Sequence, residues 1–166
     1  MLSSVGNDLN LGAIIRSAAF FDCRYIILSR EDKEAVLSTG AYRVAEGGME
    51  HVEIRTVSRP MAFLRSAAQK LFVIGADHRA RLRIRDLHGL IHGDSARDDV
   101  IHPDSQREQS SRRSGVLLVI GNEEYGLPPG IKDNCPYLAR IPGTGKIESL
   151  NVAQAASLFL HEIFEL

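Results

Sequence analysis

The sequence predicts an α/β fold with a mainly parallel sheet. Three short, continuous apolar runs are bounded by polar residues or glycine, and they cover residues 25–28, 71–75 and 116–121. Each run is too short for a helix and does not alternate with polar residues, so each predicts a strand that is buried on both faces. Segments with helical spacing lie between and after these runs, and such alternation is typical of the α/β class.

Three segments account for the expected helices. Residues 11–21 place Ile14, Ala18 and other apolar side chains on one arc, and residues 60–70 open with a proline, which is favoured in the first helical turn. Residues 149–164 are apolar around most of the helical circumference. This last segment predicts a largely buried helix, with Ser149 as its expected N-cap.

Length and composition indicate a single globular domain over residues 1–166. Apolar residues make up 44% of the chain and charged residues 25%, which is ordinary for a soluble protein. No apolar run approaches the roughly 20 residues of a membrane span, and no secretory signal is visible. Cys23 and Cys135 form no paired or zinc-binding spacing, so we expect a cytoplasmic protein without disulfides and without a membrane partner.

The formal net charge of −1 removes the simplest argument for nucleic acid binding. The charge is unevenly distributed, however, and one quarter of the chain is basic. Residues 51–90 carry 8 basic and 3 acidic side chains, a local charge of +5. Arginine occupies every second position there: Arg79, Arg81, Arg83 and Arg85. An extended backbone would place these guanidinium groups on one face, as a phosphate-contacting stripe or as the solvated face of a half-exposed strand. After it, residues 91–115 are polar and predict a long surface loop or insert.

The sequence lacks the motifs of several familiar enzyme and cofactor-binding classes. Residues 143–146 suggest a P-loop, but Ile147 follows the lysine where Ser or Thr would hold magnesium. The histidines between residues 88 and 102 have no carboxylate or cysteine to complete a zinc set, so no metal is expected. No G-x-S-x-G elbow and no G-x-G-x-x-G turn occur. Serine hydrolysis and dinucleotide binding are therefore unsupported.

Three polar segments with glycines remain, and each stands at the end of an expected strand or the start of an expected helix. They cover residues 10–18, 121–126 and 141–153. Each has a plain structural interpretation beside a functional one: Asn10 and Ser149 as N-caps, and residues 121–126 as an ordinary turn. Asn151 has no such explanation, because asparagine is mildly unfavourable inside a helix.

These three segments resemble a set of family signatures. Residues 10–18 match N-x-G-A-I-I-R-[ST]-A, residues 121–126 match G-N-E-x-x-G, and residues 141–153 match I-P-x-x-G-x-x-[ES]-S-L-N-V-[AS]. In this order they resemble the three motifs of the SpoU/TrmH-type RNA ribose 2′-O-methyltransferases of the SPOUT superfamily. Residues 41–52 are also similar to the segment that follows the second strand in such enzymes.

The resemblance implies a SPOUT fold, with a Rossmann-like sheet and a C-terminal deep trefoil knot. It also implies S-adenosylmethionine as methyl donor and a homodimer that acts on tRNA or rRNA. Cofactor contacts are implied at Ile120, Gly121, Asn122, Ile141, Gly145 and Leu150. Arg16 resembles the catalytic arginine, which we expect to gather the RNA phosphate and stabilise the developing alkoxide. Four further positions match residues that shape the site and orient the ribose: Asn10, Glu123, Ser149 and Asn151.

The chain also departs from the family pattern. It opens only a few residues before the first motif, so we expect the first β-strand to be missing or curtailed, and no separate N-terminal RNA-binding domain. Binding of RNA would then depend on Arg16 and on the arginines of residues 79–85. The alternative function is a catalytically weak or inactive knotted protein in RNA binding or assembly, including a truncated family member. Methylation of a protein or of an RNA base is a third interpretation.

Overall fold

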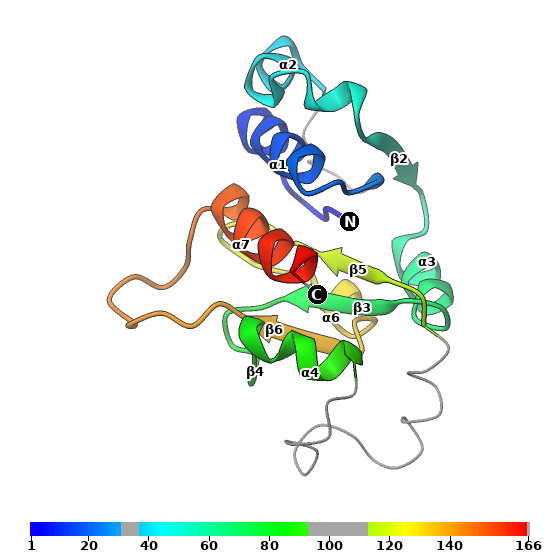
Figure 1. Cartoon of the computed structure of the whole chain (residues 1–166), viewed down its shortest axis with the longest axis vertical. Helices are drawn as coiled ribbons and strands as arrows, with labels where there is room; N and C mark the ends of the chain where they lie inside the picture. The colour runs from blue at the N-terminus through cyan, green and yellow to red at the C-terminus, as the bar shows by residue number, and fades with distance from the viewer. Residues whose placement is uncertain (31–36, 93–112, 166) are drawn as a thin grey trace.

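The computed structural model describes residues 1–30, 37–92 and 113–165, and every structural statement below refers to these ranges. Helices and strands alternate along the chain (Figure 1). The elements are α1 (Asp8–Phe20), β1 (Tyr25–Ser29), α2 (Thr39–Ala45), η1 (Gly48–Glu50), β2 (Glu53–Val57), α3 (Pro60–Ala67), β3 (Phe72–Ala76), β4 (Leu82–Arg83), η2 (Ile84–Asp86), α4 (Leu87–His92), β5 (Val116–Val119), α6 (Pro129–Lys132), β6 (Tyr137–Arg140) and α7 (Val152–Phe164).

All paired strands are parallel, which confirms the predicted fold class. The main sheet has the order β4-β6-β3-β5, and β1 pairs with β2. Residues 1–3 join the two groups, because Leu2 N donates to Ile27 O at 2.8 Å and Ser3 N donates to Ile120 O at 2.9 Å. The first strand, which we expect to be missing or curtailed, is thus reduced to a few residues, and the isolated bridges of Leu2 with Leu28 and Ile120 connect the two sheets.

The amino group of Met1 is buried in this arrangement. It donates a hydrogen bond to Leu118 O at 2.5 Å, and burial lowers its pKa to about 5. The group is therefore uncharged at neutral pH, which avoids most of the cost of taking a charge out of water.

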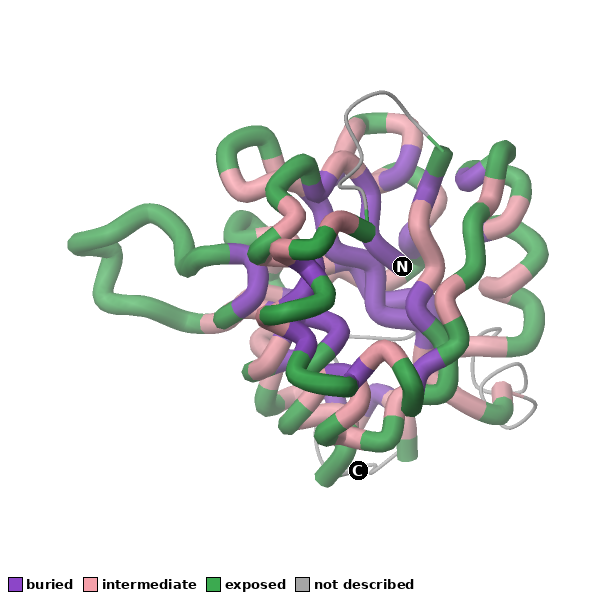
Figure 2. The backbone as a smooth tube through the Cα atoms, turned by 90° about the horizontal axis from the view of Figure 1, so that it is seen from above, coloured by how far each residue is buried: buried purple, intermediate pink, exposed green. Residues whose placement is uncertain are grey.

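Helices cover both faces of the sheet. Successive residues of a strand point to opposite faces, so β3 and β5 each contribute to two cores. On one face Phe72, Ile74 and Leu118 pack with α1, α4 and α7, whereas on the other Val73 and Val119 pack with α3 and α6. The buried residues gather at the centre of the molecule, and the loop between β6 and α7 projects from it (Figure 2). The C-terminal trefoil knot that the resemblance implies stays a prediction.

The apolar runs and helical segments of the sequence match β1, β3, β5, α1, α3 and α7. β3 is buried along nearly its whole length, as predicted. β1 is not buried on both faces, and Tyr25 is 45% exposed, because this strand lies next to the edge strand β2 and receives less cover.

The expected N-caps are wrong at both functional helices. α1 begins before Asn10, and its N-cap is Asn7, whose side chain accepts from the backbone N–H groups of Leu9 and Asn10. α7 begins after Ser149, and its N-cap is Asn151. In each case the cap is the residue at which the backbone enters the helix, and the spacing of apolar residues does not locate that residue.

The continuous arginine stripe is also wrong as a structural expectation. The backbone is extended only at β4, and a 3-10 turn follows at once, so alternate arginines do not share one face. Arg83 forms an ion pair with Asp86, with its Nε 2.9 Å from Oδ2. The hydrogen bond from Arg83 lowers the pKa of that carboxyl group. Arg79, Arg81 and Arg85 are exposed.

Residues 91 and 92 of the predicted polar loop over residues 91–115 belong to α4, whereas residues 113–115 form no helix or strand and lead into β5 at Val116. α4 extends to His92, and the cation of Arg113 lies 5.2 Å from the ring centroid of Phe72 and 5.7 Å from that of Tyr137. Arg113 Nη1 also donates to the Tyr137 hydroxyl at 2.9 Å. Residues 93–112 lie outside the described part of the chain.

Candidate functional site

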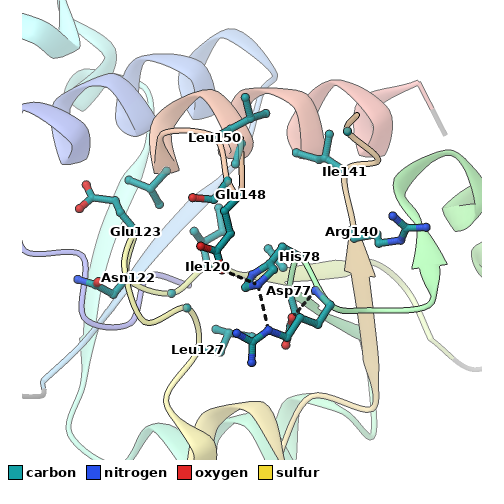
Figure 3. Close-up of a pocket in the computed structure, with 18 of the residues that line it drawn as sticks. Asp77, His78, Ile120, Asn122, Glu123, Leu127, Arg140, Ile141, Glu148 and Leu150 are labelled. Carbon is teal, nitrogen blue, oxygen red and sulfur yellow. Dashed lines mark hydrogen bonds and ion pairs between the residues drawn. The ribbon is translucent and has the colours of Figure 1, made fainter. Parts of the chain in front are cut away.

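A pocket opens at the carboxyl ends of β3, β5 and β6. Its walls are the turns that follow these strands, together with the loop that leads into α7 (Figure 3). The cavity measures about 790 Å³, within the range of small-molecule sites. Ligands of open α/β sheets bind at this edge, because the turns after parallel strands meet there.

All six residues that the resemblance implies for the cofactor line this one pocket. They are Ile120, Gly121, Asn122, Ile141, Gly145 and Leu150. The side chains of Ile120, Ile141 and Leu150, from the ends of β5 and β6 and from the loop before α7, supply apolar surface to this space (Figure 3). Apolar surface at one wall suits an aromatic heterocycle, and the polar side chains that also line the pocket can fix the orientation of such a ligand.

The turn at residues 121–126 is closed by close packing of backbone on backbone. A Cβ atom at Gly121 would lie 2.2 Å from Gly126 O, so only glycine fits there. Asn122 and Gly126 exchange backbone hydrogen bonds of 2.9 Å, and Asn122 Oδ1 accepts from Glu124 N at 2.8 Å. The spacing of the G-N-E-x-x-G motif is therefore the spacing of a tight turn, from which Glu123 contacts Asn10 of the first motif.

Polar side chains from all three motifs meet beside the pocket. Asn10 donates its side-chain amide to Glu123 Oε1, and Asn151 donates its amide to Asn10 Oδ1 at 3.1 Å. Asn151 Oδ1 meanwhile accepts from the backbone N–H groups of Ala153 and Gln154, which caps α7. One chain of hydrogen bonds thus connects residues 10, 123 and 151, far apart in sequence.

The other two candidate catalytic residues lie apart from this chain of hydrogen bonds. Ser149 lines the pocket on the exposed loop before α7. Arg16 does not line the pocket, because it follows Asn10 by six residues on α1, about 9 Å along the helix. Its Nη2 instead lies 3.0 Å from Glu46 Oε2, and both side chains are more than half exposed.

A polar wall of the pocket was missed by the sequence analysis. Asp77 follows β3, as Gly121 closely follows β5, and it forms an ion pair with Lys132 from α6. Burial raises the pKa of Asp77, but the hydrogen bond from Lys132 and that from Arg79 N outweigh it and keep the pKa low. His78 Nε2 lies 3.7 Å from Glu148 Oε1, across the cavity mouth (Figure 3). The rule that carboxyl ends of strands meet would have found this wall.

Of the four arginines in residues 79–85, only Arg79 lines the pocket. Its Nε donates to His78 Nε2 at 3.1 Å. Among the described residues no group of three or more His, Cys, Asp or Glu side chains could hold a metal ion. None of the described helices has both the length and the apolar character needed to cross a bilayer.

Comparison with known proteins identifies the class that this fold and site define. The model of the SpoU rRNA Methylase family matches residues 1–161, so the chain belongs to this family. A structure of an AdoMet-bound rRNA methyltransferase from Sinorhizobium meliloti is 27% identical, with a TM-score of 0.73 over 98% of this chain and 53% of that chain.

Two curated relatives match over nearly the whole chain. An uncharacterized tRNA/rRNA methyltransferase of Archaeoglobus fulgidus is 30% identical over 98% of this chain and 62% of its own length. The 23S rRNA (guanosine-2′-O-)-methyltransferase RlmB of Coxiella burnetii is 28% identical over 98% of this chain and 56% of its own length. The chain therefore spans about three-fifths of these relatives.

Proposed function

We propose that this chain transfers the methyl group of S-adenosylmethionine to a ribose 2′-hydroxyl of tRNA or rRNA. The observation that carries the proposal is the hydrogen-bonded chain Glu123–Asn10–Asn151, in which Asn10 contacts both other side chains, beside a ligand-sized pocket. The Sinorhizobium structure was solved with AdoMet, and the Coxiella relative is named as a guanosine-2′-O-methyltransferase. Both names support this activity.

The residues of the pocket suit the cofactor. Ile120, Ile141 and Leu150 offer apolar surface to the adenine ring, and the backbone groups around Gly121 and Gly145 can bind its polar edge. When bound, the cofactor supplies a methyl group attached to a positively charged sulfur, and the neutral thioether that remains after transfer is the leaving group. Transfer then depends on alignment of the acceptor oxygen and on removal of one proton.

Asn10, Glu123 and Asn151 orient the ribose in this proposal. Their amide and carboxylate groups offer donors and acceptors at one point beside the pocket, where a sugar can exchange hydrogen bonds with them. Ser149 borders the same space from the loop before α7. In this proposal, the four polar groups on α1, the tight turn, the loop before α7 and the start of α7 orient the sugar oxygen toward the methyl group.

Arg16 reaches the reaction from a second copy of the chain. Leu9, Arg16 and Phe20 are seven and four residues apart, so they lie on one face of α1. This face is exposed, with Leu9 at 52% and Phe20 at 81%, and α7 beside it exposes Leu158 and Phe164. A homodimer through α1 and α7 would bury this apolar surface. It would also bring Arg16 near the partner's pocket, where it gathers the phosphate and stabilises the alkoxide.

Exposed basic side chains make the RNA contacts outside the pocket in this proposal. Arg79, Arg81 and Arg85 are exposed near the pocket-side end of β3 and β4, whereas Arg83 is held by Asp86. We assign phosphate contacts to the first three, with a smaller share for Arg83, because exposed guanidinium groups bind phosphate and release counterions.

Labelled AdoMet incubated with total tRNA and rRNA tests the function. A 2′-O-methyl group blocks attack by the 2′-oxygen on the neighbouring phosphate, so label should survive alkali within uncleaved dinucleotides. Label in mononucleotides would indicate base methylation instead. AdoMet binding measured by titration calorimetry without transfer to either RNA would favour the second candidate, a knotted RNA-binding or assembly protein, to which the position of Arg16 outside its own pocket lends support.

A further inference from the structure

The segment from α2 to η1 packs against α1 on both sides of Arg16. A Cβ atom at Gly12 would lie 2.4 Å from Ala41 O, and one at Gly48 would lie 3.2 Å from the Cα atom of Arg16. Backbone approaches this close fix the position of one segment along the other, because neither can slide without a clash. The segment is therefore placed accurately with respect to Arg16.

Glu46 lies in this segment with an unusual backbone conformation. It follows α2 as its C-cap with φ 45° and ψ 50°, in the left-handed region. Glycine or asparagine is the usual residue there, because a Cβ atom is unfavourable in this conformation. A glutamate at this position therefore calls for an explanation from its side chain.

The side chain of Glu46 ends at Arg16. Its Oε2 lies 3.0 Å from Arg16 Nη2, and the two side chains are 60% and 57% exposed, respectively. An exposed ion pair of this kind adds little to stability. It does, however, restrict a long side chain that would otherwise sample many rotamers.

We propose that Glu46 is a positioning residue that holds the Arg16 guanidinium in the orientation needed for methyl transfer. This inference rests on the proposed function, in which Arg16 stabilises the reacting ribose and its phosphate. One carboxylate oxygen contacts one terminal nitrogen, and a guanidinium group has five N–H donors in a planar fork. The contact with Glu46 thus leaves donor capacity for an RNA phosphate on the same group.

Two substitutions of Glu46 test the proposal, with Glu53→Gln as the matched control. Glu46→Gln keeps the length of the side chain and removes its charge. Glu46→Gly removes the side chain but suits the left-handed backbone, so its melting temperature should equal or exceed that of the wild type. Glu53 forms an exposed ion pair with Arg55 on β2, so Glu53→Gln breaks a comparable pair away from Arg16.

In the full chain, kcat of both Glu46 variants should fall about tenfold, because the guanidinium group is less well oriented. KM for RNA should stay the same or fall, since a negative charge near a polyanion is removed. The ¹⁵N relaxation of Arg16 Nε should show a more mobile side chain in both variants and an unchanged one in Glu53→Gln. AdoMet affinity should not change.

Wild-type kcat in Glu46→Gly and Glu46→Gln would overturn the proposal, and so would unchanged order of the Arg16 side chain. A wild-type chain that methylates no ribose would refute the proposed function instead. In that case the relaxation measurement still decides whether Glu46 orders Arg16, because it does not depend on turnover.

Discussion

Asn151 donates its side-chain amide to Asn10 Oδ1 at 3.1 Å while its own oxygen caps α7. The same asparagine therefore starts a helix and joins the third motif to the first. This double use explains why asparagine stands at this position. Serine or aspartate can cap a helix equally well, but neither offers an amide donor to Asn10 at the same time.

Replacement of Asn151 should separate its function as a helix cap from the role in methyl transfer that we propose for it. Asn151→Ala should lower the free energy of unfolding by about 1 kcal/mol through loss of the cap, and it should abolish methyl transfer. Asn151→Ser keeps a capping oxygen, so its stability should stay close to that of the wild type while activity is lost. Urea unfolding and a methylation assay check both variants; an active Asn151→Ser would show that the amide is dispensable.

Gly121→Ala should disrupt the cofactor pocket. Its Cβ atom would meet Gly126 O at 2.2 Å, so the turn has to open and the pocket wall moves. AdoMet affinity should fall at least tenfold, or by about 1.4 kcal/mol, in titration calorimetry. Gly89→Ala on α4 is the control, because a Cβ atom there meets nothing within 4 Å and alanine favours a helix. Equal AdoMet affinity in the two variants would contradict a pocket at this turn.

Arg16→Ala should abolish methyl transfer and leave AdoMet affinity unchanged, because Arg16 does not line the pocket of its own chain. Loss of both properties would contradict the role proposed for it. Co-refolding of Arg16→Ala with Gly121→Ala should restore about a quarter of the wild-type activity, since half of the dimers are mixed and each has one intact site. Without restoration, Arg16 does not act on the partner's pocket.

The Arg83–Asp86 pair should make folding sensitive to acid. Asp86 has a lowered pKa in the folded protein, mainly because Arg83 donates a hydrogen bond to it. Its contribution to stability is therefore complete above the unfolded pKa of about 3.9 and disappears as the pH falls through the lower folded value. Urea unfolding of Asp86→Asn should show reduced stability at pH 7 and a gap to the wild type that closes below pH ~4. A gap that is independent of pH would exclude this linkage.

Much of the fold could be predicted from the sequence, because it depends on where apolar residues stand. The runs at residues 71–75 and 116–121 are apolar without interruption because helices pack on both faces of β3 and β5. The same spacing predicted α1, α3 and α7. The three motifs could also be recognised in the sequence, and the six expected cofactor positions lie in one pocket.

The errors occurred where a residue's role depends on contacts that are distant in sequence. Asparagine is a frequent N-cap residue, yet Asn10 lies inside α1 and donates a hydrogen bond to Glu123. Alternate arginines suggest a strand, yet the chain turns after Arg83, where Asp86 accepts its hydrogen bond. Asp77 belongs to no motif and was overlooked, although it lines the pocket.

By itself, then, the sequence determined the class of fold and the identity of the polar groups, since the spacing of apolar residues and the choice of residue types are local properties. Only the tertiary structure decided that Asn10, Glu123 and Asn151 touch and that Arg16 stands apart beside Glu46. The physical reason is that parallel strands bring their carboxyl ends to one edge whatever their separation along the chain. Six residues of helix, in contrast, carry Arg16 about 9 Å away from Asn10.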